Sequence, residues 1–209
     1  MPLDLVVIIL IAINAVVSFK AFNDMSFFRK YEFHVGSIRA GEQYRMFTSA
    51  FLHVDMQHLL FNMLTLFLFG PTVALYLGTV GFLLVYICSL ICGSLLSLFF
   101  HKDDYYYRAV GASGAVVGVI FSAILLNPDM EVNFLPGYLF GIIYLLFSIY
   151  GMKAKRDNIG HTAHFGGAIG GFAITLERMP ELFYTQTNTI ILLAIPIVIL
   201  FIMQKLGKL

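Results

Sequence analysis

The sequence predicts an all-α membrane protein, and its composition and hydropathy are the evidence for this. Of its 209 residues, 59% are hydrophobic and only 12% are charged, whereas soluble domains are close to half apolar and a quarter charged. The mean hydropathy of +0.86 agrees with this imbalance. So few polar side chains could not cover a soluble globule, which indicates an integral membrane protein. The net charge of +1 provides no basic surface for a nucleic-acid partner.

Seven apolar stretches are candidates for membrane-crossing helices, because about 20 mostly apolar residues span a bilayer. They predict a single membrane domain over residues 1–209, with a bundle of six transmembrane helices and a seventh helix at the C-terminus. The stretches are residues 4–22, 57–77, 79–100, 112–127, 135–151, 161–176 and 188–204.

The fourth and sixth stretches are short and rich in glycine. Small residues let helix backbones approach each other closely inside a membrane. We therefore expect these two helices to lie in the centre of the bundle and to pack against each other. The glycines that would mediate this packing are Gly114 and Gly118 in one helix and Gly167 and Gly171 in the other.

The longest connection, residues 23–56, mixes charged side chains with phenylalanines and tyrosines. A disordered linker would contain few aromatic residues. The composition therefore predicts a folded first loop that is partly helical and lies in the membrane interface. A second polar segment, residues 152–160, directly precedes the sixth stretch, a position from which it could act as a gate.

Polar side chains within the membrane-spanning stretches are candidates for function, because burying them in lipid is costly. Four stand out: His58, Asn62, Ser113 and His164. Ser113 lies in a Gly-Ala-Ser-Gly segment at the start of a predicted helix, where the glycines clear space around its hydroxyl. Backbone N–H groups at a helix start lack partners within the helix and can donate to a developing oxyanion. A serine that only caps the helix is the alternative.

His164 shares a helix face with Gly167 and Gly171, because residues three and four apart are neighbours on a helix. If those glycines face the helix of Ser113, the imidazole faces it too. A serine hydroxyl becomes a good nucleophile when a base takes its proton. Imidazole is the usual base, since its pKa lies near neutrality. The alternative is a core histidine bonded to a carbonyl.

His58 and Asn62 are four residues apart and therefore share one face of the second predicted helix. Imidazole and amide groups can donate hydrogen bonds to an oxyanion. The same groups also suit hydrogen bonds that only hold neighbouring helices together. The spacing of these two residues is compatible with both roles.

Together these motifs resemble the rhomboid family of intramembrane serine proteases. The resemblance covers residues 44–171 and consists of a shared order and spacing of motifs along the chain. The matching elements are Tyr44-Arg45, His53, His58, Asn62, the GASG segment at Ser113, and an AHxxGxxxG pattern from Ala163 to Gly171.

The resemblance implies that Ser113 is a catalytic nucleophile and that His164 is its general base and then acid. It implies an oxyanion site formed by His58, Asn62 and the backbone at Ser113 and Gly114. It implies no cofactor and no metal. The partners would be the lipid bilayer and the transmembrane segments of other membrane proteins, which a serine endopeptidase would cleave. The implied location is the bacterial cytoplasmic (inner) membrane.

The resemblance also assigns structural roles and shows two departures. Tyr44 and Arg45 correspond to the aromatic-arginine pair of the family's first loop, and His53 belongs to the same loop structure. Ala74 stands where many relatives carry a glutamate. Val117 stands where an aromatic residue often stacks on the catalytic histidine, so the sequence leaves open what holds that ring.

Two alternatives belong to other functional classes. A catalytically silent relative could bind transmembrane helices as a chaperone or adaptor, although such members usually lack the serine or the histidine. Histidines near one membrane face could instead bind a transition metal, although no HExxH motif is present. The histidines concerned are His53, His58, His161 and His164.

Overall fold

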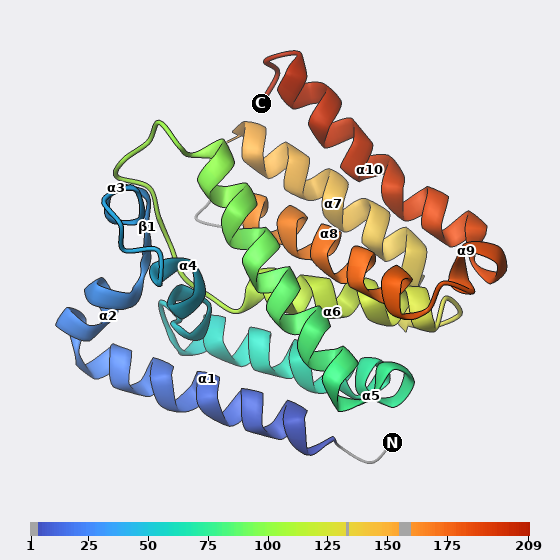
Figure 1. Ribbon diagram of the computed structural model, residues 1–209, viewed down its shortest axis with the longest axis horizontal. Helices are drawn as coiled ribbons and strands as arrows, with labels where there is room; N and C mark the ends of the chain where they lie inside the picture. Colours follow the sequence, from blue (N-terminus) through green and yellow to red (C-terminus); the bar gives the residue numbers. More distant parts are fainter. Residues whose placement is uncertain (1–3, 133, 155–159) are drawn as a thin grey trace.

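The computed structural model describes residues 4–132, 134–154 and 160–209. Residues 155–159, which belong to the possible gate at 152–160, lie outside the described residues. The described chain is a bundle of helices with two short antiparallel strand pairs (Figure 1). The elements are α1 (Leu5–Asn23), α2 (Met25–Tyr31), β1 (Phe33–His34), α3 (Val35–Arg39), α4 (Arg45–Thr48), the 3-10 helix η1 (Ser49–Phe51), α5 (Met56–Phe100), β2 (Arg108–Ala109), α6 (Ser113–Leu126), β3 (Glu131–Val132), β4 (Leu135–Pro136), α7 (Gly137–Ala154), α8 (His161–Arg178), α9 (Leu182–Thr185) and α10 (Thr187–Lys205).

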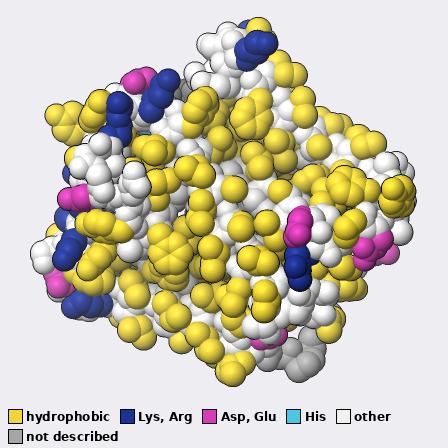
Figure 2. All heavy atoms as spheres, viewed as in Figure 1, with side chains coloured by type: hydrophobic (Ala, Val, Ile, Leu, Met, Phe, Trp, Pro, Cys, Tyr) yellow, Lys and Arg dark blue, Asp and Glu magenta, His cyan; other side chains and the backbone are white. Residues whose placement is uncertain are grey.

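Four of these helices, α1, α5, α7 and α10, are long and apolar enough to cross a membrane. Many of their large hydrophobic side chains point outward and are exposed. Figure 2 shows apolar side chains over most of the visible surface, with charged side chains gathered on the left of the view and only a few elsewhere. This distribution suits a protein surrounded by lipid, and the predicted all-α membrane fold is confirmed.

Helix α5 contains two predicted stretches, residues 57–77 and 79–100, in one element that is broken at Gly78. Gly78 has φ 68° and ψ 173°, a conformation that glycine adopts readily because it lacks a Cβ atom. Each half is about 33 Å long at 1.5 Å per residue, close to the hydrocarbon thickness of a bilayer. The Asp55 carboxylate caps the first half by accepting a hydrogen bond from the backbone N–H of His58 at 2.7 Å.

Helix α6 lies in the centre of the bundle and packs against both α5 and α8, which also pack against each other. At about 21 Å it is shorter than the hydrocarbon core. Every residue from Gly114 to Leu126 is buried. This helix is therefore surrounded by protein, which explains how a short span can be accommodated in a membrane fold.

Helices α6 and α8 touch through glycine. A Cβ atom at Gly167 would overlap the carbonyl oxygen of Gly114, and one at Gly171 would overlap the carbonyl oxygen of Gly118. A Cβ atom at Gly118 would also lie 2.7 Å from the carbonyl oxygen of Gly167. Both glycine pairs therefore lie at the contact between the two backbones, where no side chain fits.

The neighbouring face of α8 packs in the same way against the second half of α5. A Cβ atom at Gly166 would overlap the carbonyl oxygen of Cys92, and one at Gly170 would lie 2.7 Å from the Cα atom of Ser89. Helix α8 is thus in backbone contact with two helices at once. This packing restricts where the backbone of α8 can lie relative to α5 and α6.

The outer helices cover this central group. Val7 of α1 packs on α5, with its Cγ atoms 3.1 Å from where a Cβ atom at Gly70 would lie. Leu193 of α10 packs on α7, and its Cδ2 atom lies 2.7 Å from where a Cβ atom at Gly141 would be. Helices α1 and α10 therefore lie on opposite sides of the bundle (Figure 1).

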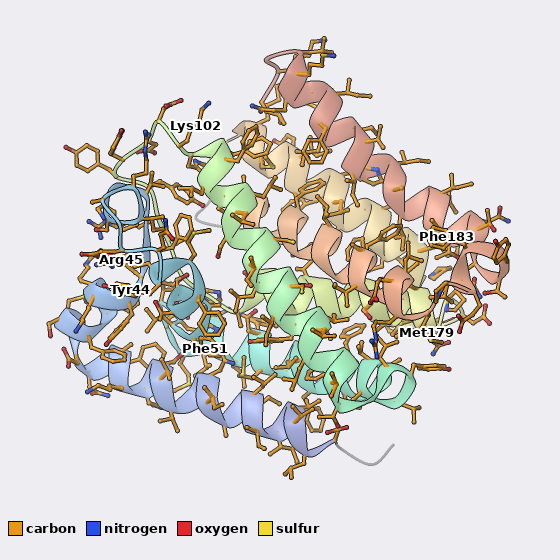
Figure 3. All side chains as sticks on the ribbon, viewed as in Figure 1. Tyr44, Arg45, Phe51, Lys102, Met179 and Phe183 are labelled. Atoms are coloured by element: carbon orange, nitrogen blue, oxygen red, sulfur yellow. The ribbon has the colours of Figure 1, made fainter. Side chains whose placement is uncertain are left out.

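The first loop is folded and contains α2, α3, α4 and η1. Buried Arg45 holds it together: its Nη1 atom donates to the carbonyl oxygens of Arg29 at 2.7 Å and Glu32 at 3.1 Å, and its Nε atom pairs with Glu42. Figure 3 shows Arg45 next to Tyr44 at the first-loop end of the molecule. The guanidinium lies 5.7 Å from the centre of the Tyr44 ring.

Candidate active site

Ser113 and His164 lie on the first turns of α6 and α8, which both begin on the first-loop side of the bundle (Figure 1). A Cβ atom at Gly114 would lie 3.2 Å from the carbonyl oxygen of Ala163 and 3.6 Å from its Cβ atom. The residue after Ser113 is therefore in contact with the residue before His164. The structure thus brings the two predicted catalytic residues onto adjoining helix turns.

No side chain caps the start of α6. Ala112 occupies the N-cap position, and no side chain makes the capping hydrogen bond there. Ser113 is the first helical residue rather than the cap. Backbone N–H groups in the first turn of a helix can donate to an anion. The site can therefore offer backbone donors beside the Ser113 hydroxyl.

The imidazole of His58 lies beside this helix start. Gly111 has φ 127°, and a Cβ atom there would lie 2.7 Å from both Cε1 and Nε2 of His58 and 3.8 Å from Oγ of Ser113. Only glycine leaves room for the ring at this point. The Nδ1 atom of His58 is buried and has no hydrogen-bond partner in the described part of the chain. The ring thus lies close to Ser113, as an oxyanion donor would require.

Asn62 lies one helical turn after His58 and is buried. Its Nδ2 atom donates a hydrogen bond of 3.0 Å to the carbonyl oxygen of His58. The amide is therefore bonded within its own helix, and an oxyanion role would require one of its two N–H groups to point toward Ser113. Its role as an oxyanion donor stays a prediction.

His53 links the first loop and α1 to the segment before the nucleophile. Its Nδ1 atom is 2.8 Å from Oγ of Ser18 in α1, and that hydroxyl donates to the carbonyl oxygen of Phe51 at 3.1 Å. The backbone N–H of Ala112 donates to Nε2 of His53 at 3.4 Å. Since Nε2 accepts, the ring proton is on Nδ1, which donates to Ser18. A neutral His53 therefore supports the backbone next to Ser113.

Burial, with a smaller contribution from nearby His58 and an opposing one from Asp55, lowers the pKa of His53 to about 3. The ring is therefore neutral at ordinary pH, as its bond with Ala112 requires. Protonation would replace the acceptor at Nε2 with a donor and would break that bond. The support for the segment before Ser113 is consequently sensitive to acid.

We expect the free energy of unfolding to decrease as the pH falls below about 6.5, the ordinary pKa of histidine. The folded pKa of His53 is depressed, so the unfolded chain binds the extra proton between about pH 6.5 and pH 3. At pH 5 the loss would be about 2 kcal/mol. Unfolding experiments in detergent micelles at pH 7 and pH 5 measure this difference in the free energy of unfolding.

The matched control is His53→Gln, which keeps a donor and an acceptor but does not titrate. Its loss of stability between pH 7 and pH 5 should be smaller than that of the wild type. Some loss should remain, because burial and the charge of Arg108 also lower the pKa of His34. Equal losses in the two proteins would contradict the role of His53.

The first loop supports the whole segment that precedes Ser113. Backbone hydrogen bonds join the two segments at several points along their length, and the Glu32 carboxylate forms an ion pair with Arg108. Displacing the first loop would therefore displace the start of α6. The bonded or paired positions are Gly36 with Tyr105, Val35 with Tyr107, His34 with Arg108, Phe33 with Ala109, and Ser49 with Gly111.

Ser113 is one of the residues that line a small cavity of about 40 Å³. A water molecule needs about 10–15 Å³ of such volume and a few polar partners. The residues that line it include serines and glycines beside apolar side chains, and its volume is enough for a water molecule. The serines and glycines among the lining residues include Ser49, Ser94, Ser97, Gly111, Ser113 and Gly160.

The four histidines named as possible metal ligands form two ring pairs. The ring centres of His53 and His58 are 4.9 Å apart, and those of His161 and His164 are 6.1 Å apart. Within residues 4–132, 134–154 and 160–209, no group of three or more His, Cys, Asp or Glu side chains is placed to hold a metal ion.

Sequence reasoning missed Tyr144 of α7, whose hydroxyl is 2.9 Å from Nδ1 of His164. A tyrosine inside a membrane-spanning stretch needs a hydrogen-bond partner for its hydroxyl, which was the available signal. The same helix also carries Tyr138 and Tyr150. The sequence alone therefore does not single out the tyrosine that reaches the histidine.

Comparison with known proteins identifies the family to which the chain is similar. The Rhomboid domain model matches residues 40–181. The chain is 34% identical over 135 residues to Rhomboid protease GluP of Bacillus subtilis. The aligned residues make up 65% of this chain and 26% of that protein. It is 37% identical over 137 residues to Putative rhomboid protease YdcA of the same bacterium, covering 65% of this chain and 67% of that protein.

A plant relative extends the match. RHOMBOID-like protein 12, mitochondrial, of Arabidopsis thaliana is 28% identical over 172 residues, which is 73% of this chain and 51% of that protein. The matched parts thus span about a quarter of GluP and half of the plant protein. Because the family model covers more than half of the chain and includes Ser113 and His164, the chain belongs to the rhomboid family.

Proposed function

We propose that this chain is an intramembrane serine endopeptidase in which Ser113 is the nucleophile and His164 the general base. The observation that supports this most strongly is the contact between the first turns of α6 and α8, where Gly114 meets Ala163. A serine needs a neighbouring base to become nucleophilic, and this contact puts an imidazole on the adjoining turn. The presence of proteases among the relatives agrees with the proposal.

In the proposed reaction, Oγ of Ser113 attacks the carbonyl carbon of the scissile peptide bond while His164 takes the hydroxyl proton. The negative charge that develops on the carbonyl oxygen faces the N–H groups at the start of α6 and the ring of His58. The C–N bond then breaks, and His164 gives its proton to the leaving amine. Water activated by His164 attacks the acyl ester and releases Ser113. The adjoining cavity can supply that water.

The proposed substrates are transmembrane segments of other membrane proteins, which reach the site through the surrounding lipid. A helical peptide bond is sterically shielded and its groups are hydrogen-bonded, so the substrate must unwind locally beside Ser113. Residues that weaken a helix, such as glycine and proline, should therefore favour cleavage. We propose the bacterial cytoplasmic membrane as the location, in line with the two Bacillus relatives, although other relatives are named as mitochondrial.

A serine-directed fluorophosphonate tests the proposal without knowledge of the substrate. The folded wild-type protein in detergent should become labelled, and mass spectrometry of its peptides should place the label on Ser113. Ser113→Ala should not be labelled. If the folded wild-type protein takes up no label at Ser113, the protease proposal is wrong and a helix-binding role becomes the better explanation.

The oxyanion site gives a quantitative expectation. His58→Ala and Asn62→Ala should each lower kcat by about 10²-fold with little change in KM, because an oxyanion donor acts mainly in the transition state. Gln57→Ala, an exposed neighbour on the same helix, is the matched control and should keep wild-type kcat. Steady-state cleavage of a model transmembrane substrate measures all three. If a variant keeps kcat within twofold of the wild type, the replaced residue is not an oxyanion donor.

A further inference from the structure

The structure contains a hydrogen bond between α7 and the first turn of α8. The hydroxyl of Tyr144 is 2.9 Å from Nδ1 of His164, and the two ring centres are 5.7 Å apart. Nδ1 is the ring nitrogen nearer to the backbone, so a bond at this atom restrains the rotation of the ring. The nitrogen across the ring, Nε2, then lies in a fixed direction.

The Tyr144 side chain is itself held in place. Phe140, one turn earlier on α7, stacks against its ring with centres 5.9 Å apart and an interplanar angle of 25°. Further along, α7 meets α8 so closely that a Cβ atom at Gly151 would overlap the ring of His161. The hydroxyl therefore reaches His164 from a helix that is packed against α8.

The hydrogen bond is compatible with the tautomer that the catalytic base needs, because a tyrosine hydroxyl can accept as well as donate. A neutral imidazole carries one proton, and it can take the proton of Ser113 at Nε2 only if its own proton is on Nδ1. In that form Nδ1–H donates to the hydroxyl oxygen of Tyr144. We propose that Tyr144 is a positioning residue that holds His164 in this orientation and tautomer, an inference that rests on the proposed dyad.

The bond should matter most when charge develops. After Nε2 has taken the proton from Ser113, the His164 ring is an imidazolium and both of its nitrogens carry hydrogen. The Tyr144 oxygen still accepts from Nδ1–H, and hydrogen bonds from charged donors are the stronger ones. Without the hydroxyl, the charged ring would lose this hydrogen bond in surroundings of low dielectric constant. Tyr144 should therefore affect the transition state more than substrate binding.

The first test is Tyr144→Phe, which removes the hydroxyl and keeps the ring. We expect kcat to fall about 10- to 100-fold with KM within twofold of the wild type, as for the loss of a hydrogen bond to a charged group. Tyr150→Phe makes the same change at an exposed position of the same helix and should keep wild-type kcat. A Tyr144→Phe variant with wild-type kcat, or with a change in KM alone, would overturn the proposal.

A second readout does not depend on activity. Nitrogen NMR of protein labelled with ¹⁵N-histidine distinguishes the two neutral tautomers, and the His164 signals are those that disappear in His164→Ala. The wild type should carry the proton on Nδ1, and Tyr144→Phe should shift the ring toward a mixture. An unchanged tautomer in Tyr144→Phe would overturn the proposal. If the wild type shows the expected tautomer but takes no serine probe at Ser113, the protease proposal fails while the Tyr144 contact stands.

Discussion

Replacing Ser113 or His164 with alanine is expected to lower kcat for cleavage of a transmembrane substrate by about 10⁶-fold. Serine proteases lose on this order when either the nucleophile or the base is removed, because the two act as a unit. The double variant should therefore be no slower than either single variant. Kinetics with purified protein in detergent or liposomes measure the three rates.

The matched control is Ser122→Ala, on the same helix as Ser113. Ser122 is buried and accepts a hydrogen bond of 2.6 Å from the Thr175 hydroxyl on α8. Losing this bond should reduce the free energy of unfolding by about 1 kcal/mol and leave cleavage in place. If Ser113→Ala cleaves at the wild-type rate, or if the two single-site losses multiply in the double variant, the dyad mechanism is wrong.

Substitution of Gly167 by alanine is expected to have the second-largest effect. Its Cβ atom would overlap the carbonyl oxygen of Gly114, so the backbones of α6 and α8 would have to separate. Overpacking of this kind costs about 1–3 kcal/mol or more. A shift of about 1 Å between Ser113 and His164 would also lower the rate by about 10²-fold. Thermal unfolding and steady-state cleavage measure the two effects.

Gly160→Ala is the matched control for stability. This residue precedes α8, has φ −76°, and offers room for a methyl group, since the nearest atom to its Cβ position is the Cβ of Ala163 at 3.8 Å. The unfolding temperature of Gly160→Ala should stay close to that of the wild type. A Gly167→Ala variant that unfolds and cleaves like the wild type would show that close contact at Gly114 is not required.

The helix positions and the candidate residues on α8 could largely be predicted from sequence, because both depend on local patterns. Apolar runs of bilayer length mark the helices, and the spacing of His164, Gly167 and Gly171 places them on one face. The break at Gly78 was predicted as a boundary between two helices. The structure joins the two halves through a glycine that takes a positive φ.

Contacts between distant segments could not be predicted in this way. His53 joins Ser18 of α1 to the backbone of Ala112, and these three residues are far apart in the chain. The rotation of α7 about its axis decides which of its tyrosines reaches α8, and the apolar pattern of α7 does not define that rotation. Tyr144 therefore emerged only from the structure.

The most direct test of the central claim is to map the products of cleavage. Purified protein would be reconstituted in liposomes with a single-span substrate whose transmembrane segment contains glycine, and product masses would locate the cut. We expect the wild type to produce one cut within or next to the membrane segment, and Ser113→Ala to produce none. No products from the folded wild-type protein, or the same products from Ser113→Ala, would contradict the assignment of this chain as an intramembrane serine protease.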